Sequence, residues 1–115
     1  DPAYLRYNID SAREFPAAST QLVMSGQIGD PSLDMAGQIS GALDAVQTVL
    51  EVAGYALADL ARITIYTTDV DAFIASYDVI RTRFEPGTVA PHTLVPVTRL
   101  ARLGCVVEID AQAAR

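Results

Sequence analysis

The sequence predicts a single two-layer α+β domain in which two helices pack on one face of a mixed β-sheet. Apolar residues recur at steps of three and four in segments 34–53 and 70–84, as in amphipathic helices. Segments rich in β-branched residues alternate with them, at residues 21–28, 61–69, 92–100 and 105–113. The length of 115 residues suits one domain spanning 1–115. Helices inserted between strands in this order favour a sheet with both helices on the same side.

The first part of the chain contains two predicted strands and a turn. Residues 4–10 alternate weakly and are compatible with an opening strand. Residues 21–28 form a clearer strand, and within it Ser25 precedes Gly26, where a glycine permits a bulge or a close backbone approach. A turn is predicted at residues 29–32, which contain Gly, Asp, Pro and Ser.

The first helix is the strongest periodic element. Asp34 is suited to its N-cap, and Gly54 is placed for the left-handed residue that follows a helix. Its apolar stripe comprises Met35, Ile39, Ala42, Leu43, Val46, Val49, Leu50 and Ala53.

The second half of the chain repeats the alternation of strand and helix. A β-branched run predicts a strand over 61–69, and a second apolar stripe predicts a helix over 70–84 that stops near Pro86. The last two strands, 92–100 and 105–113, are predicted to be joined by a short loop.

The predicted sheet has one face that no helix can cover. Val106 and Val107 are apolar on both sides of the pleat of the last strand. We therefore expect the uncovered face to pack against further copies of the chain, as in a cyclic homo-oligomer.

The charge and the content of Lys, His and Cys exclude several function classes. The net charge is −6, and all eight basic residues are Arg. The lack of Lys excludes a Schiff-base enzyme and a Walker phosphate loop, and the negative charge disfavours nucleic acid. With only His92 and Cys105, neither a zinc site nor a disulfide can form within the chain. We expect no metal and no cofactor.

The expected location is the cytoplasm, without a membrane span. A single Cys fits a reducing compartment, and no apolar run approaches the length of a spanning helix. The chain begins at Asp1 without Met or a signal-like segment, so we expect a trimmed N-terminus.

Two residues are candidates for chemistry. Glu108 follows Val106 and Val107, and desolvation by apolar neighbours would raise its pKa toward the range of a general acid or base. The same pattern is compatible with an outward-facing strand residue. His92 is the only His, and at the start of a strand it could equally be structural. By the same residue-level reasoning, Tyr77 fits a core position.

Five sequence elements, in this order and spacing, resemble the reactive intermediate deaminase (Rid) family, also called YjgF-like or L-PSP proteins. The elements are residues 25–28 (SGQI), 42–54, 65–73 (IYTTDVDAF), 97–100 (VTRL) and 107–111 (VEIDA). The resemblance covers roughly residues 20–114. It implies a chorismate-mutase-like fold, usually a homotrimer with clefts between subunits, and hydrolysis of enamines or imines of 2-oxo acids without a cofactor.

The resemblance also assigns site residues. It places the family's water-positioning Glu on Glu108 and its Ser-Gly on Ser25 and Gly26. The family's carboxylate-binding Arg corresponds to His92, within the segment 90–93 that ends at Thr93, and a frequent Asn corresponds to Tyr77. Because a neutral His grips a carboxylate far less well than Arg, ordinary 2-imino acid deamination should fall by orders of magnitude.

Two functions remain open at this point. The chain could be an enzyme acting on another imine, enamine or related small molecule, with Glu108 holding water and His92 donating a hydrogen bond. It could instead be a trimeric small-molecule-binding or regulatory protein without catalysis.

Overall fold

The computed structural model describes residues 12–84 and 89–115. The strand predicted at 4–10 lies outside these residues. The described elements are β1 (Gln21–Gln27), α2 (Met35–Val52), the short 3₁₀ helix η1 (Leu57–Asp59), β2 (Leu60–Thr67), α3 (Val70–Ala75), α4 (Asp78–Arg81), β3 (His92–Pro96) and β4 (Val107–Ala114).

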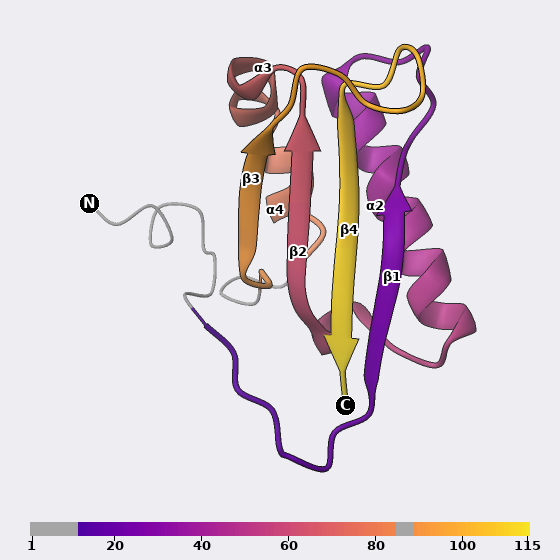
Figure 1. The fold of residues 1–115 in the computed structure, drawn as a ribbon, viewed down its shortest axis with the longest axis vertical. Helices are drawn as coiled ribbons and strands as arrows, with labels where there is room; N and C mark the ends of the chain where they lie inside the picture. Colours follow the sequence, from indigo (N-terminus) through magenta and orange to yellow (C-terminus); the bar gives the residue numbers. More distant parts are fainter. Residues whose placement is uncertain (1–11, 85–88) are drawn as a thin grey trace.

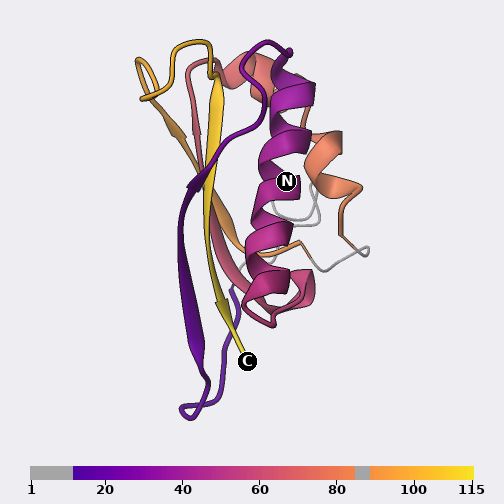
Figure 2. The same cartoon turned by 90° about the vertical axis from the view of Figure 1, so that its right-hand side faces the viewer.

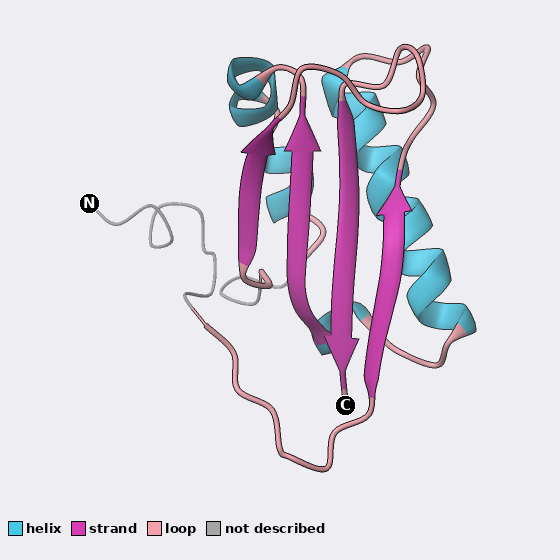
Figure 3. Ribbon diagram, in the orientation of Figure 1, coloured by secondary structure: helices cyan, strands magenta, loops and turns pink. Residues whose placement is uncertain are grey.

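The four strands form one mixed sheet in the order β1-β4-β2-β3 (Figures 1 and 3). Strand β4 is inserted between β1 and β2 and runs antiparallel to both. Strands β2 and β3 run parallel, and the connection between them carries α3 and α4. The mixed sheet and the α+β class agree with the prediction.

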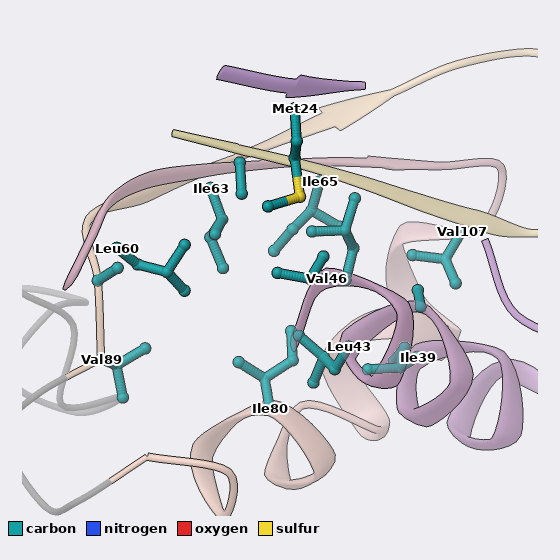
Figure 4. Close-up of a cluster of buried hydrophobic side chains, with 14 of the residues drawn as sticks. Met24, Ile39, Leu43, Val46, Leu60, Ile63, Ile65, Ile80, Val89 and Val107 are labelled. Atoms are coloured by element: carbon teal, nitrogen blue, oxygen red, sulfur yellow. The ribbon is translucent and has the colours of Figure 1, made fainter. Parts of the chain in front are cut away.

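The helices of the described residues all lie on one side of the sheet (Figure 2). The core fills the space between them, where Ile63 and Ile65 of β2 meet Leu43 and Val46 of α2 (Figure 4). Because side chains alternate along a strand, every second residue points the other way. These residues form what we call the uncovered face: Val23 on β1, Arg62, Thr64 and Tyr66 on β2, Thr93 on β3, and Glu108, Asp110 and Gln112 on β4.

The predicted limits of the long helix α2 are confirmed. Asp34 is the N-cap, and its side chain accepts a hydrogen bond from the Gly37 N–H at 2.9 Å. Beyond the helix, Gly54 has a φ of 85°, which a glycine adopts without strain. Local sequence therefore defines both ends of this element.

The single helix predicted over 70–84 is wrong, because the structure has two short helices, α3 and α4. At their junction the N–H groups of Tyr77, Val79 and Ile80 donate to carbonyls three residues back instead of four. Phe73, Tyr77 and Ile80 are nevertheless buried on one side. The apolar spacing is thus preserved across the break, which is why periodicity did not detect it.

The last two strands are shorter than predicted, for a shared reason. Strand β2 ends at Thr67, which pairs with Pro96 on one side and with Val107 on the other. Beyond Thr67 neither β3 nor β4 has a ladder partner on β2, so β3 ends at Pro96 and β4 begins at Val107.

Among the described residues, no helix has the length and apolar character needed to cross a bilayer.

Candidate functional site

The carboxylate of Glu108 lies against Gly26 on the uncovered face. Glu108 pairs with Tyr66 of β2, and an irregularity in the pairing of β1 with β4 falls between Met24 and Gln27. A Cβ atom at position 26 would lie 2.5 Å from Glu108 Oε2. The glycine predicted at a bulge therefore leaves room for the side chain of Glu108.

The environment of Glu108 differs from the one its sequence neighbours suggested. Val107 and Ile109 are fully buried and point toward the helices, whereas Glu108 is half-buried on the other face. The two apolar neighbours therefore do not enclose its carboxylate. Only what lies over the uncovered face could do so.

A second carboxylate on this face has a different partner. Tyr66 Oη donates a hydrogen bond to Asp110 Oδ2 at 3.2 Å. The negative charge of Asp110 raises the pKa of Tyr66 above its usual value, so the phenol stays protonated at neutral pH. Asp110 is thus engaged by Tyr66, while Glu108 lies beside Gly26.

His92 faces the helices, not the uncovered face. It pairs with the buried Ile63, and its Nε2 lies 3.0 Å from Tyr77 Oη, while Nδ1 lies 3.0 Å from the Ala90 carbonyl oxygen. The phenol ring of Tyr77 and the imidazole ring of His92 stack with their centroids 5.7 Å apart. Tyr77, at the junction of α3 and α4, is buried. The two residues that the resemblance places at the family's Arg and Asn positions therefore contact each other.

These contacts define the protonation of His92. A carbonyl oxygen only accepts, so Nδ1 carries the hydrogen and Nε2 accepts from the Tyr77 hydroxyl. Burial lowers the pKa of His92 below 6.5, and the hydrogen bond to the Ala90 carbonyl opposes this shift only in part. The imidazole is therefore neutral at pH 7.

The predicted site residues fall into separate groups within one chain. Ser25 is exposed beside Gly26 and Glu108 on β1 and β4. His92 and Tyr77 lie on the helix side of the sheet, and the exposed Thr93 lies on the uncovered face of edge strand β3. A direct contact between His92 and Glu108 is therefore not formed inside the chain. It would require two copies.

A pocket of about 330 Å³ opens where β2 and β3 begin, and its lining includes two of the predicted residues. It is lined by Ala12, Arg13, Ala61, Arg62, Pro91, His92 and Thr93. Sequence reasoning missed both arginines. Arg62 could have been found, because the alternation of β2 predicts it on the uncovered face. Arg13 carried no local signal, since it is placed by hydrogen bonds to the Ala58 and Leu60 carbonyls.

The described residues offer no cluster of three or more His, Cys, Asp or Glu side chains able to hold a metal ion. Cys105 is buried at the end of the loop before β4. The polar side chains of the candidate site therefore carry carboxylate, phenol, hydroxyl, imidazole and guanidinium groups.

The same fold occurs in solved structures of related proteins. A Yersinia pestis protein of the Rid family aligns with a TM-score of 0.83, over 97% of this chain and 90% of its own, at 23% identity. A Mycobacterium tuberculosis member of the YjgF/YER057c/UK114 family aligns with a TM-score of 0.74 at 33% identity. The alignment covers 83% of this chain and 79% of the Mycobacterium tuberculosis chain. These alignments show that the chain has the fold of both solved structures.

Sequence comparison defines the family. The family model described as Endoribonuclease L-PSP matches residues 9–115. The chain belongs to this family, the Rid/YjgF/L-PSP proteins. Among curated relatives, the 2-iminobutanoate/2-iminopropanoate deaminase of Escherichia coli K12 is 29% identical over 100 residues, which cover 84% of this chain and 77% of the relative.

Proposed function

We propose that this protein acts on a reactive imine or enamine at a crevice between copies of the chain, and that it is not a standard 2-imino acid deaminase. The name of the Escherichia coli relative supports the imine class. The observation that carries the second part is the hydrogen bond between Tyr77 and His92. It joins the two residues that stand at the family's carboxylate-binding Arg and at its frequent Asn.

The Tyr77–His92 pair is a poor carboxylate binder. An arginine offers a permanent charge and two parallel donors, whereas the imidazole is neutral, and both its nitrogens already have partners within the chain. A substrate held elsewhere, or one without a carboxylate near this position, fits better. Tyr77 also takes up space that a smaller Asn would leave open.

The proposed chemistry asks little of the protein, because an imine carbon is already electrophilic. Water adds to that carbon, the nitrogen gains protons, and the carbon–nitrogen bond breaks to give a carbonyl compound and ammonia. Glu108 is the group proposed to position the water and accept its proton. Gly26 leaves the space in which this carboxylate lies.

The crevice is proposed to require more than one copy. Within one chain the sheet separates Glu108 from His92, and the uncovered face that bears Glu108 also bears Val23, which is 72% exposed. A homotrimer, the usual assembly of the family by resemblance, would bring the uncovered face of one copy to the edge of another.

The first experiment measures deamination of 2-iminopropanoate generated in situ. We expect little or no acceleration by the unmodified protein. Activity should rise in His92→Arg, and rise further in the double variant His92→Arg/Tyr77→Asn, because Asn frees the space beside the new guanidinium. Robust activity of the unmodified protein would contradict the proposal.

A second experiment tests the role of Glu108. It measures ammonia release from a panel of imines and enamines without a carboxylate. Glu108→Gln should lower turnover by about 10²-fold or more, as expected for loss of a general base. Asp110→Asn is the matched control, because Asp110 lies on the same strand and face. Gly26→Ala should lower turnover as Glu108→Gln does, because its Cβ displaces the Glu108 carboxylate. For the same reason, adding Gly26→Ala to Glu108→Gln should lower turnover little further.

A non-catalytic binding protein is the second candidate. It is favoured by the saturation of both His92 nitrogens within the chain, which leaves the imidazole no free group for proton transfer. Ligand binding in the panel without ammonia release, equal in the unmodified protein and in Glu108→Gln, would support this candidate against the enzyme.

A further inference from the structure

We infer that Gln38 of α2 is a positioning residue for Glu108, and that it acts by anchoring Val106, two residues before Glu108 in the chain. Gln38 lies on the helix side of the sheet, and the carboxylate of Glu108 lies on the uncovered face. The catalytic consequence rests on the proposed function, in which Glu108 positions water. The effect on where the carboxylate lies rests only on hydrogen bonds within the chain.

The side-chain amide of Gln38 acts as a strand partner for the segment before β4. Its Oε1 accepts a hydrogen bond from the Val106 N–H at 2.8 Å, and its Nε2 donates to the Gly104 carbonyl at 3.0 Å. A neighbouring parallel strand also bonds the carbonyl before a residue and the N–H after it. Nε2 also donates to the Leu33 carbonyl at 2.9 Å, which ties the amide to the turn before α2. Gln38 is 1% exposed, so water cannot replace these bonds.

The backbone of Val106 is held on its other side by β2. Its carbonyl accepts a hydrogen bond from the Thr68 N–H at 3.1 Å and another from Thr67 Oγ1 at 2.8 Å. Thr67 is the last residue of β2, so the ladder ends beside this point. Gln38 and Thr67 therefore fix the N–H and the carbonyl of Val106 directly before β4 begins.

Strand β1 gives Glu108 no comparable support. The pairing of β1 with β4 reaches only to Gln27 opposite Ile109, beyond the irregularity that contains Gly26. Among the strand pairs of the described residues, Glu108 has a partner on β2, which is Tyr66, and none on β1. The position of Glu108 relative to β1 therefore depends on how the start of β4 is anchored.

The fit between Glu108 and Gly26 is sensitive to that position. A Cβ atom at position 26 would lie 2.5 Å from Oε2, 2.7 Å from Cδ and 2.9 Å from Cγ of Glu108, so the side chain lies directly against the glycine. Displacement of a catalytic group by about 1 Å can lower a rate by about 10²-fold. Loss of the Gln38 anchor should therefore move the carboxylate away from Gly26 and slow the reaction proposed for it.

The first test measures the position of Glu108 independently of turnover. In the unmodified protein we expect a nuclear Overhauser effect between Glu108 Hγ and Gly26 Hα, since an Hα stands where the Cβ would. This effect should be lost in Gln38→Met. The control is Leu50→Ala, at the other end of α2, where loss of a fully buried side chain lowers stability without touching β4's anchor. The control should keep the effect.

Thr67→Val replaces Gln38→Met in this test if the latter does not fold. It removes the hydroxyl that bonds the Val106 carbonyl and keeps the shape of the side chain. The same Overhauser effect should weaken, because release of Val106 from either side loosens the start of β4. An unchanged effect in this variant would then count against the anchor.

The second test measures kcat and KM on the panel of imines and enamines. Gln38→Met should lower kcat about ten-fold or more, with a smaller change in KM. In the Glu108→Gln background it should lower kcat little further, because a positioning residue acts only through the group that it positions. Leu50→Ala should keep the kcat of the unmodified protein at a temperature where all these variants are folded.

Three results would overturn the inference. They are an Overhauser effect that persists in Gln38→Met, its equal loss in Leu50→Ala, and a fall in kcat that is the same with and without the Glu108 carboxylate. The proposed function fails in a different way. Loss of the Overhauser effect in Gln38→Met, with no ammonia release by any form of the protein, would support the anchor and contradict only the enzyme.

Discussion

His92 is held between a backbone carbonyl and a phenol, and these two contacts determine its charge. The Ala90 carbonyl accepts the Nδ1 hydrogen, the Tyr77 hydroxyl donates to Nε2, and burial disfavours the imidazolium. A second proton would reverse the hydrogen bond to Tyr77 and place a charge in the half-buried site. At the scale of the residue, His92 therefore supplies no positive charge at neutral pH where the resemblance places the family's Arg.

The pH dependence of the free energy of unfolding should show that the native state disfavours the charged form of His92. In the unfolded chain His92 binds a proton near pH 6.5, whereas its native pKa is lower. Between these two values the unfolded state binds more protons, so the contribution of His92 to stability is complete above pH 6.5 and is lost as the pH falls through the native pKa.

Urea unfolding at pH 7.5 and at pH 5 tests this prediction. The unmodified protein should lose more free energy of unfolding than His92→Gln over this interval, because the variant keeps a neutral side chain at every pH. An NMR titration should place the imidazole pKa below 6.5. A pKa at or above 6.5 would show that the site tolerates the charged form.

At the scale of the elements, Gln38 of α2 joins the turn before this helix to the loop before β4, which is distant in the sequence. Its Nε2 donates to the Leu33 carbonyl at 2.9 Å and to the Gly104 carbonyl at 3.0 Å, and its Oε1 accepts from the Val106 N–H at 2.8 Å. The side chain is buried in α2. It thereby fixes the entry of β4, two residues before Glu108, to the helix.

Replacing this amide by an apolar chain of similar size should be costly. Gln38→Met leaves one buried N–H and two carbonyls without their partner, and the expected loss is about 3 kcal/mol of unfolding free energy. Gln47→Met, half-buried on the same helix, is the control and should change stability by less than about 1 kcal/mol. Urea unfolding measures both. Equal effects would mean that the Gln38 network does not stabilise the start of β4.

At the scale of the whole molecule, the sheet has helices on one side only (Figure 2). Val23 on the uncovered face is 72% exposed, and Tyr66, Glu108 and Asp110 share that face. The proposed crevice and its division of residues between copies both depend on this face meeting another copy.

A charge on this face should therefore dissociate the proposed homotrimer. Val23→Asp is expected to give a monomer by light scattering, since an aspartate in a close contact between copies would be desolvated. Val52→Asp, at a valine 85% exposed at the end of α2, is the control and should leave the assembly unchanged. A Val23→Asp variant with the mass of the unmodified protein would place the interface elsewhere.

Sequence reasoning predicted the elements with local signals and missed their limits where a partner strand sets them. Asp34 and Gly54 define the ends of α2 through contacts within a few residues, so the pattern sufficed. The end of β3 and the start of β4 follow from the end of β2 at Thr67, which no local pattern in those strands contains. The break between α3 and α4 leaves the apolar spacing intact and so left no trace in the periodicity.

The candidate site was predicted in its residue types and not in its arrangement. The alternation of β4 alone is compatible with Glu108 on either face, and the resemblance pointed to Gly26 without its contact with that carboxylate. The register of His92 with Ile63 places its ring on the helix side of the sheet, beside Tyr77, which no local pattern around His92 indicated.

The amino-acid order by itself determined the class of fold, the long helix with both its ends, and the family, because these depend on periodicity, capping and motif spacing along the chain. Only the tertiary structure decided which side of the sheet each polar residue faces, and that the side chains of His92 and Tyr77 contact each other. The physical reason is that strand register and ring-to-ring contacts arise between segments far apart in the sequence, where no local pattern specifies the partner.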